Sequence, residues 1–249
     1  MGKNQQVPVY RDEAIVLRTQ RLGEADRIVT LLTKQHGQLR AVAKGVRKTT
    51  SRLGARVEPF SHVDLLLASG KSLEIISQVE SINAYGAQLA SDYPKWTAGQ
   101  AMLETAEKLT SETNEPALQQ YLLLLGGLRS LVTAEHDPGL ILDAFILRSL
   151  AIAGYAPSFA DCAHCGEPGP HRAFSPSAGG MVCNSCRPIG SASPRPETVA
   201  LMAALLSGDW ETADEAPRAS RSESRSLTAA YLTWQLDRQL RSLRLVERN

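Results

Sequence analysis

The chain has 249 residues, of which 43% are hydrophobic and 21% charged, and its formal net charge is +1. From the polar first seven residues we expect no secretory signal. The longest apolar stretch, near residues 118–128, is interrupted by glutamines and glycines and is too short to cross a bilayer. We therefore expect a cytoplasmic protein with no membrane association, in which cysteines serve as metal ligands or catalytic groups more often than as disulfides.

The first 80 residues predict short strands separated by turns. The expected strands are EAIVLRT, DRIVTLLT, LRAVAK, HVDLLLA and SLEIISQV, all rich in valine, isoleucine and leucine. Five short strands in about 80 residues are typical of a small barrel, of which the OB-fold is the commonest candidate and an SH3-like barrel the alternative. We place this domain at residues 1–82.

From residue 83 the apolar period becomes helical, so the chain is expected to be α+β. Helices are predicted to end near Glu112, to start at Pro116, and to run from Asp137-Pro138 to Gly154. ETVALMAALLS and the segment after residue 225 predict two more helices, with a polar loop at 208–224 between them. We assign residues 83–249 to one helical domain.

All four cysteines lie within a Gly- and Pro-rich insertion at about 155–192. Cys162-x-x-Cys165 and Cys183-x-x-Cys186 stand seventeen residues apart, a spacing typical of zinc ribbons. Four cysteines fill the tetrahedral coordination of one Zn²⁺ ion and leave no position for water, so the site is expected to be structural. Redox chemistry and disulfide formation are the alternatives.

Residues 43–60 form the densest basic stretch of the chain. Five cations occur there before the first acid, Glu58: Lys44, Arg47, Lys48, Arg52 and Arg56. The formal charge is +5 over residues 1–80, −8 over 81–217 and +4 over 218–249, which favours a polyanionic partner at the basic ends. Because aromatic residues are scarce near this loop, we expect contacts with phosphates rather than base stacking. The alternative is a solvated loop.

The segment from residue 13 to residue 67 resembles the N-terminal region of the RecO family of bacterial DNA repair proteins. The resemblance is carried by Gly23-Glu24-x-Asp26-Arg27, His36-Gly37, Ala43-Lys44-Gly45-x-Arg47, Ser51-Arg52-x-Gly54 and Glu58-Pro59-Phe60. The helical middle and the four-cysteine ribbon extend it along the chain. It implies an N-terminal OB-fold, a helical domain with a zinc ribbon, and no enzymatic turnover.

The resemblance also implies partners and sites. Members of this family bind single- and double-stranded DNA near the nucleoid, anneal complementary strands, including strands coated with single-strand binding protein, and act with RecR and RecF to load RecA. They also bind the acidic, hydrophobic-ended tail of single-strand binding protein, for which Arg129 or Arg148 is the expected cation here. Arg18, Arg27, Lys34 and Arg40 are expected to extend the DNA-binding surface of the basic loop.

Several alternatives remain open at this point. Arg27 has a second interpretation as an ion-pair partner of Glu24 or Asp26. The C-terminal arginines are expected either to form a second strand site or to solvate the last helix. The competing functions are a zinc-ribbon adaptor that recruits proteins with little direct DNA binding, and an enzyme that uses zinc or thiols.

Overall fold

The structure is a computed structural model that describes residues 8–47, 53–111, 115–236 and 242–243. The chain divides into two compact units. The first comprises Met1–Trp96 and Ala106–Val132, and the second comprises Thr97–Thr105 and Thr133–Asn249. Among the described helices, none is both long and apolar enough to pass through a membrane.

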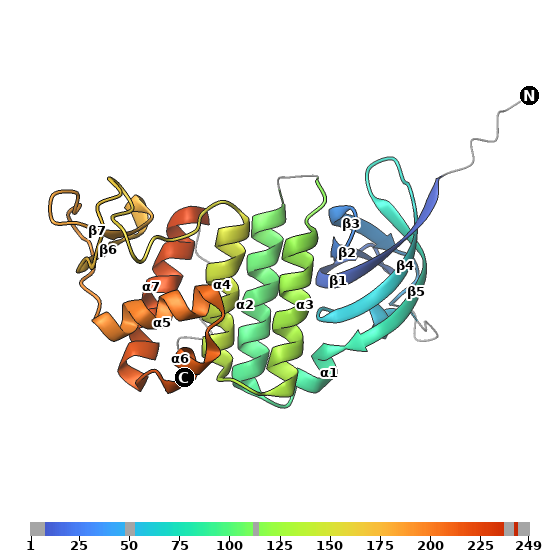
Figure 1. The fold of residues 1–249 in the computed structure, drawn as a ribbon. Coiled ribbons are helices and arrows are strands. Elements are labelled where there is room, and N and C mark those ends of the chain that lie inside the picture. Colours follow the sequence, from blue (N-terminus) through green and yellow to red (C-terminus); the bar gives the residue numbers. More distant parts are fainter. Residues whose placement is uncertain (1–7, 48–52, 112–114, 237–241, 244–249) are drawn as a thin grey trace, which may run out of the picture. The chain divides into compact units, whose positions relative to one another are not determined.

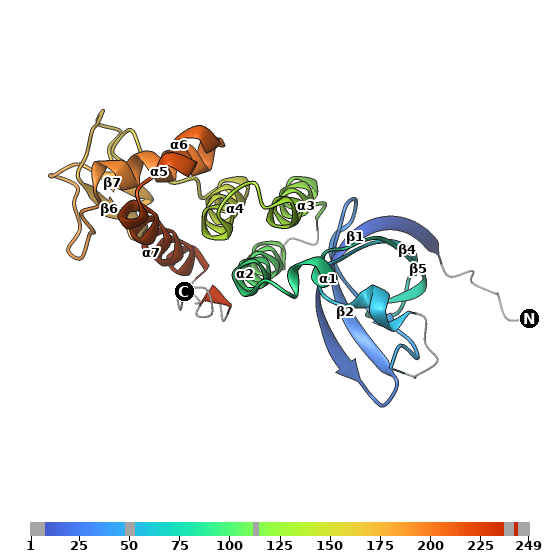
Figure 2. The same ribbon diagram turned by 90° about the horizontal axis from the view of Figure 1, so that it is seen from below.

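The first unit contains a closed five-stranded barrel (Figure 1; Figure 2). Its strands are β1 (Val9–Leu22), β2 (Asp26–Thr33), β3 (Gly37–Ala43), β4 (Ser61–Ala68) and β5 (Glu74–Ala84). The order around the barrel is β1-β2-β3-β5-β4; β3 and β5 pair in parallel and the other neighbours are antiparallel. This arrangement confirms the predicted α+β fold with an N-terminal five-stranded OB-fold barrel.

The barrel closes because its strands alternate apolar side chains with period two. Val63, Leu65 and Leu67 of β4 are completely buried in the barrel core, as are Val29 and Leu31 of β2. Burying each such side chain contributes about 1.5–3 kcal/mol. A short 3₁₀ turn (Gly54–Val57) lies between β3 and β4 and adds Val57 to this core.

Four helices follow the barrel in sequence: α1 (Tyr85–Leu89), α2 (Tyr93–Thr110), α3 (Leu118–Thr133) and α4 (Pro138–Ile152). The predicted start at Asp137-Pro138 is confirmed, because the Asp137 carboxylate accepts the N–H of Gly139 at 2.8 Å and caps α4. The predicted start of the preceding helix at Pro116 is wrong. The N–H of Tyr121 donates to Ala117 O, so α3 begins at Leu118.

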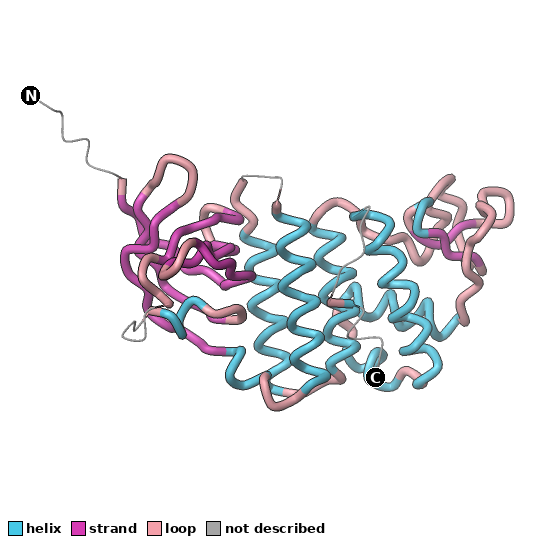
Figure 3. Tube along the Cα trace, turned by 180° about the vertical axis from the view of Figure 1, so that it is seen from behind, coloured by secondary structure: helices cyan, strands magenta, loops and turns pink. Residues whose placement is uncertain are grey.

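The C-terminal part contains α5 (Pro196–Ser207), α6 (Trp210–Glu215) and α7 (Arg218–Leu236). The loop predicted at 208–224 is therefore wrong over most of its length (Figure 3). Asp209 caps α6 by accepting the N–H of Thr212 at 3.1 Å. The serines that read as a polar loop include Ser220 and Ser224, which are buried on α7. Because these serines are small, the face of α7 that carries them can pack closely against neighbouring elements.

The cysteine segment folds around a small hairpin of β6 (Ala173–Ser175) and β7 (Gly180–Val182). Gly179, with φ of +91°, ends the turn that leads from β6 into β7. Phe174 of β6 is buried against Tyr231 of α7, with ring centroids 5.9 Å apart. The Tyr231 hydroxyl donates to Tyr155 O at 3.2 Å, so the base of the ribbon is fixed to α7.

Candidate nucleic-acid interface and metal centre

Nine cations of the barrel region are predicted to contact DNA, and the structure describes seven of them. Lys48 and Arg52 lie outside the described residues. The described ones are Arg18, Arg27, Lys34, Arg40, Lys44, Arg47 and Arg56. They fall into two classes, those with an acceptor inside the protein and those without one.

Three of these cations bind acceptors on neighbouring elements of the first unit. The Arg18 guanidinium pairs with Glu107 of α2 at 2.8 Å. Lys34 pairs with Glu13 at 3.0 Å, and Arg56 donates to the backbone oxygen of Val79 at 2.9 Å. Each contact competes with a phosphate for the same N–H groups.

Arg27 and Arg47 hold the base of the basic loop. Arg27 pairs with Glu58, so the predicted ion pair with Glu24 or Asp26 is wrong. The Arg47 guanidinium donates to the backbone oxygens of Gly23 and Glu24, at 3.2 and 2.9 Å. The Gly23–Arg27 motif and the Ala43–Arg47 motif, which stand about twenty residues apart in the sequence, therefore meet at one end of the barrel.

Arg40 and Lys44 are exposed and have no acceptor among the residues that the structure describes. A third such cation, Arg21, is exposed near the end of β1 and was not predicted from the sequence. Arg21 lies directly opposite Arg27 in the β1–β2 register, so two guanidinium groups occupy neighbouring positions on one face. Its place two residues before the Gly23-Glu24 turn was the signal that could have found it. These three cations are free to bind an anion.

A buried polar network joins α3 to the barrel. His62 of β4 and the Tyr121 hydroxyl are 2.8 Å apart, and the hydroxyl donates to Glu13 at 3.3 Å. Burial lowers the pKa of His62 and raises that of Tyr121, and Glu13 raises the Tyr121 pKa further. His62 is therefore neutral at physiological pH, and the network serves to position α3.

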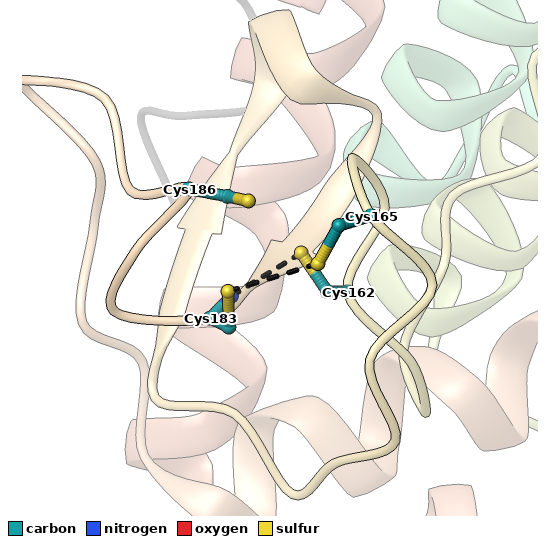
Figure 4. A group of neighbouring side chains, drawn as sticks. All are labelled: Cys162, Cys165, Cys183 and Cys186. Carbon is teal, nitrogen blue, oxygen red and sulfur yellow. Dashed lines mark hydrogen bonds between the residues drawn. The ribbon is translucent and has the colours of Figure 1, made fainter.

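The four cysteines converge on one point beside the β6–β7 hairpin (Figure 4). All four sulfur atoms lie within 4.8 Å of one another, and those of Cys165 and Cys183 are 3.9 Å apart. Tetrahedral zinc with bonds of about 2.3 Å places its sulfur ligands about 3.8 Å apart. The donor set and its geometry therefore fit a metal ion, with no fifth protein ligand among the described residues.

The two knuckles present their sulfurs through backbone turns. Gly166, with φ of +76°, follows the first pair, and its N–H donates to Cys162 O at 2.8 Å. The Cys183 N–H donates to the Cys162 sulfur at 3.4 Å, and this bond is the main reason that the pKa of Cys162 is lowered to about 6. Hydrogen bonds with Cys165 and Cys183 raise the pKa of Cys186 to about 12, so four thiolates at this point require a cation to balance their charge. The small apolar cluster around the site consists mainly of alanine, valine and cysteine, so the segment has little core of its own.

A groove of about 540 Å³ lies between the start of α4 and the first turns of α7, inside the second unit. Arg218, Arg221 and Arg225 line one side, and Leu140 and the buried Asp143 line the other. Arg221 donates to the backbone oxygens of Asp214 and Ala216. Burial raises the pKa of Asp143 to about 7, although Arg225 and the Ser224 hydroxyl act in the opposite direction. Asp137 also lines the groove, so three arginines stand against two aspartates and the lining has a modest excess of positive charge.

The two arginines predicted to hold a partner tail differ in their surroundings. Arg129 is exposed on α3. Arg148 is partly buried on α4, where its Nε donates to Leu205 O at 3.0 Å. The three arginines of α7 that line the groove were not among the residues predicted from the sequence. Their spacing of three and four residues places them on one helix face, which would have been a usable signal had the segment not been taken for a loop.

Comparison with known proteins gives matches over nearly the whole chain. The family model "Recombination protein O N terminal" matches residues 7–85, and "Recombination protein O C terminal" matches residues 90–244. The chain is 62% identical over 240 residues to DNA repair protein RecO of Thermobifida fusca, covering 96% of this chain and 99% of that protein. The chain belongs to the RecO family of DNA repair and recombination proteins.

Two further RecO proteins show the same extent of similarity. That of a Nocardioides species is 59% identical over 243 residues, and that of Streptomyces coelicolor is 58% identical over 247 residues. Each match covers 96% of this chain and almost all of the relative. The resemblance to the RecO family, inferred from the Gly23–Phe60 motifs, is thus confirmed across the barrel, the helices and the four-cysteine metal site.

Proposed function

We propose that this RecO family protein is a recombination mediator that binds single- and double-stranded DNA through the barrel and anneals complementary strands, without enzymatic turnover. The observation that carries the proposal is a set of cations with no acceptor among the described residues: Arg21 and Lys44 at the base of the basic loop, and Arg40 further along β3. Lys48 and Arg52, in the sequence between the two described ends of that loop, complete the proposed surface.

Annealing requires that two polyanionic strands be screened from each other while their bases stay free to pair. Cations on flexible side chains neutralise phosphates and release counterions, which gives strong, salt-dependent binding that is indifferent to sequence. Binding to phosphates requires no aromatic side chain, so the bases are not held by stacking. The same property allows the surface to accept either single or double strands.

We propose that the acidic, hydrophobic-ended tail of single-strand binding protein docks in the groove between α4 and α7. The groove offers Arg218 and Arg225 for carboxylates, and Leu140 provides an apolar contact for the tail end. Its volume falls within the range of typical ligand sites. Arg148 is less suited than these residues because its Nε is already bound to Leu205 O. Arg129, on α3 of the first unit, stays a separate prediction for the cation that binds the tail.

In this proposal the four cysteines hold one Zn²⁺ ion that stabilises the ribbon against α7 and takes no part in catalysis. RecR, RecF and RecA are the functional partners, and the protein acts in the cytoplasm on nucleoid DNA. The adaptor alternative would keep the ribbon as a protein-binding element but remove the need for the free cations of the barrel.

The DNA-binding proposal is tested by a salt titration of oligonucleotide binding. The variant replaces Arg21, Arg40 and Lys44 with glutamine, and the control replaces Lys95, Lys108 and Arg172, which removes the same charge elsewhere. Each lost phosphate contact is expected to lower the slope of log K against log salt by about 0.7–0.9. An unchanged slope in the barrel variant would support the adaptor function instead.

A further inference from the structure

We propose that Asp26 and Arg47 are positioning residues of the DNA-binding surface, which hold the base of the basic loop in place and do not themselves contact DNA. This inference rests on the proposed function of the barrel. It assigns a role to an acidic residue on a surface expected to bind a polyanion, and it removes one arginine from the set of direct contacts.

Asp26 is the first residue of β2, and its carboxylate faces the chain that leaves β3. Its Oδ1 accepts the N–H of Gly45 at 2.7 Å, a charge-assisted bond. Gly45 has φ of +66°, a conformation that favours glycine, so the chain turns at this point. Lys44 directly precedes that turn, and its exposed side chain depends on the turn for its position.

Arg47 also binds the segment that follows β3 to the β1–β2 turn. Its backbone N–H donates to Ala25 O at 2.9 Å, and its guanidinium donates to the oxygens of Gly23 and Glu24. Both guanidinium bonds come from the same terminal nitrogen, Nη1. A phosphate that engaged this nitrogen would release the backbone carbonyls of the β1–β2 turn, and the loop would lose its support.

The far end of the loop is held next to the same turn. Arg27, which follows Asp26 in the sequence, pairs with Glu58 just after the 3₁₀ turn. Gly54 approaches the backbone of Val46 so closely that a β-carbon there would lie 2.7 Å from Val46 O. The two ends of the loop are thus brought together, with adjacent residues of β2 binding each of them.

A positioning role and a purely electrostatic role of Asp26 predict opposite changes in DNA affinity when Asp26 is replaced. Replacing Asp26 removes a negative charge from a DNA-binding face, which by charge alone would tighten binding. If Asp26 positions the loop, the same replacement weakens binding. Glu24 provides a matched control, because it is an exposed acid of the same turn whose carboxylate has no partner among the described residues.

The first test measures the affinity of the full-length protein for a single-stranded oligonucleotide by fluorescence anisotropy. Asp26→Ala is expected to bind about tenfold more weakly than wild type, the effect of losing roughly one charge-assisted hydrogen bond. Asp26→Asn, whose amide oxygen still accepts the Gly45 N–H, is expected to stay near wild type. Glu24→Ala is expected to bind equally well or more tightly. Asp26→Ala binding as tightly as Glu24→Ala would overturn the proposal.

The second test does not depend on whether Asp26→Ala folds. Arg47→Lys keeps the charge, but the lysine side chain is one bond shorter and lacks the rigid planar group that places Nη1 within reach of both carbonyls. Positioning predicts that Arg47→Lys is as weak as Arg47→Ala, whereas a direct phosphate contact predicts affinity close to wild type, which would contradict the proposal. Failure of the glutamine variant of Arg21, Arg40 and Lys44 to change DNA binding would instead count against the proposed function itself.

Discussion

Asp143 offers a quantitative test of the packing between α4 and α7. Its carboxyl group is buried, and the only hydroxyl bonded to it among the described residues belongs to Ser224, at 3.3 Å. Burial raises its pKa from the usual value of 3.8 to about 7, with Arg225 and Ser224 offsetting part of the effect. The folded protein therefore favours the protonated acid, and we predict that Asp143→Asn stabilises the fold at alkaline pH.

The magnitude follows from the linkage between protonation and folding. Because the folded pKa is raised, the contribution of this group is fully favourable below pH 3.8 and is lost as the pH rises to about 7. When the pH rises from 5.5 to 8.5, the free energy of unfolding of the wild type falls only until the pH reaches the folded pKa of about 7. This interval is about 1.5 pH units. At 1.36 kcal/mol per unit this amounts to about 2 kcal/mol. Asparagine does not titrate and avoids this loss.

The assay is urea denaturation of wild type and Asp143→Asn at pH 5.5 and pH 8.5, followed by circular dichroism. The stability advantage of the variant is expected to be about 2 kcal/mol larger at pH 8.5 than at pH 5.5. Glu211→Gln, which replaces an exposed acid of α6, serves as the control and is expected to show no such difference. An advantage that does not change with pH would refute the assignment of a raised pKa to Asp143.

Two further predictions concern the ribbon and the junction between α3 and the barrel. Cys183→Ser is expected to abolish stoichiometric zinc binding, measured by metal analysis. It is also expected to lower the melting temperature, because zinc binding contributes about 10–16 kcal/mol of apparent free energy to such segments. Ser185→Ala in the same knuckle is the control, and an unchanged melting temperature without bound metal would contradict a structural ion. Tyr121→Phe is expected to cost about 1 kcal/mol in urea denaturation, since it leaves His62 and Glu13 without the hydroxyl between them. No loss of stability would show that this network does not hold α3.

The barrel could be predicted because each strand carries a local signal. DRIVTLLT coincides with β2 from end to end, and the alternation of Val63, Leu65 and Leu67 fixes which face of β4 is buried. The cysteine spacing was equally informative, because four thiolates within reach of one ion need only two knuckles. The loop predicted at 208–224 was wrong since serine-rich sequence indicates exposed chain, whereas Ser220 and Ser224 face the interior of the second unit.

The organisation of the candidate site was less accessible to sequence reasoning. A run of cations does not reveal which of them are already bound within the protein. Arg47 looks equivalent to Lys44 in the sequence, yet it donates to the β1–β2 turn while Lys44 has no described acceptor. Arg27 pairs with Glu58 thirty-one residues away, in preference to the acids next to it, because strand pairing and loop closure bring those two side chains together. Such choices depend on tertiary contacts.

The central claim is that free cations of the barrel allow this RecO family protein to anneal DNA. The most direct measurement is the rate at which two complementary oligonucleotides pair, with and without a coat of single-strand binding protein, in the presence of wild type or the glutamine variant of Arg21, Arg40 and Lys44. The account predicts that wild type accelerates pairing on both substrates and that the variant loses this acceleration while keeping its fold. Equal acceleration by the variant and wild type would contradict it.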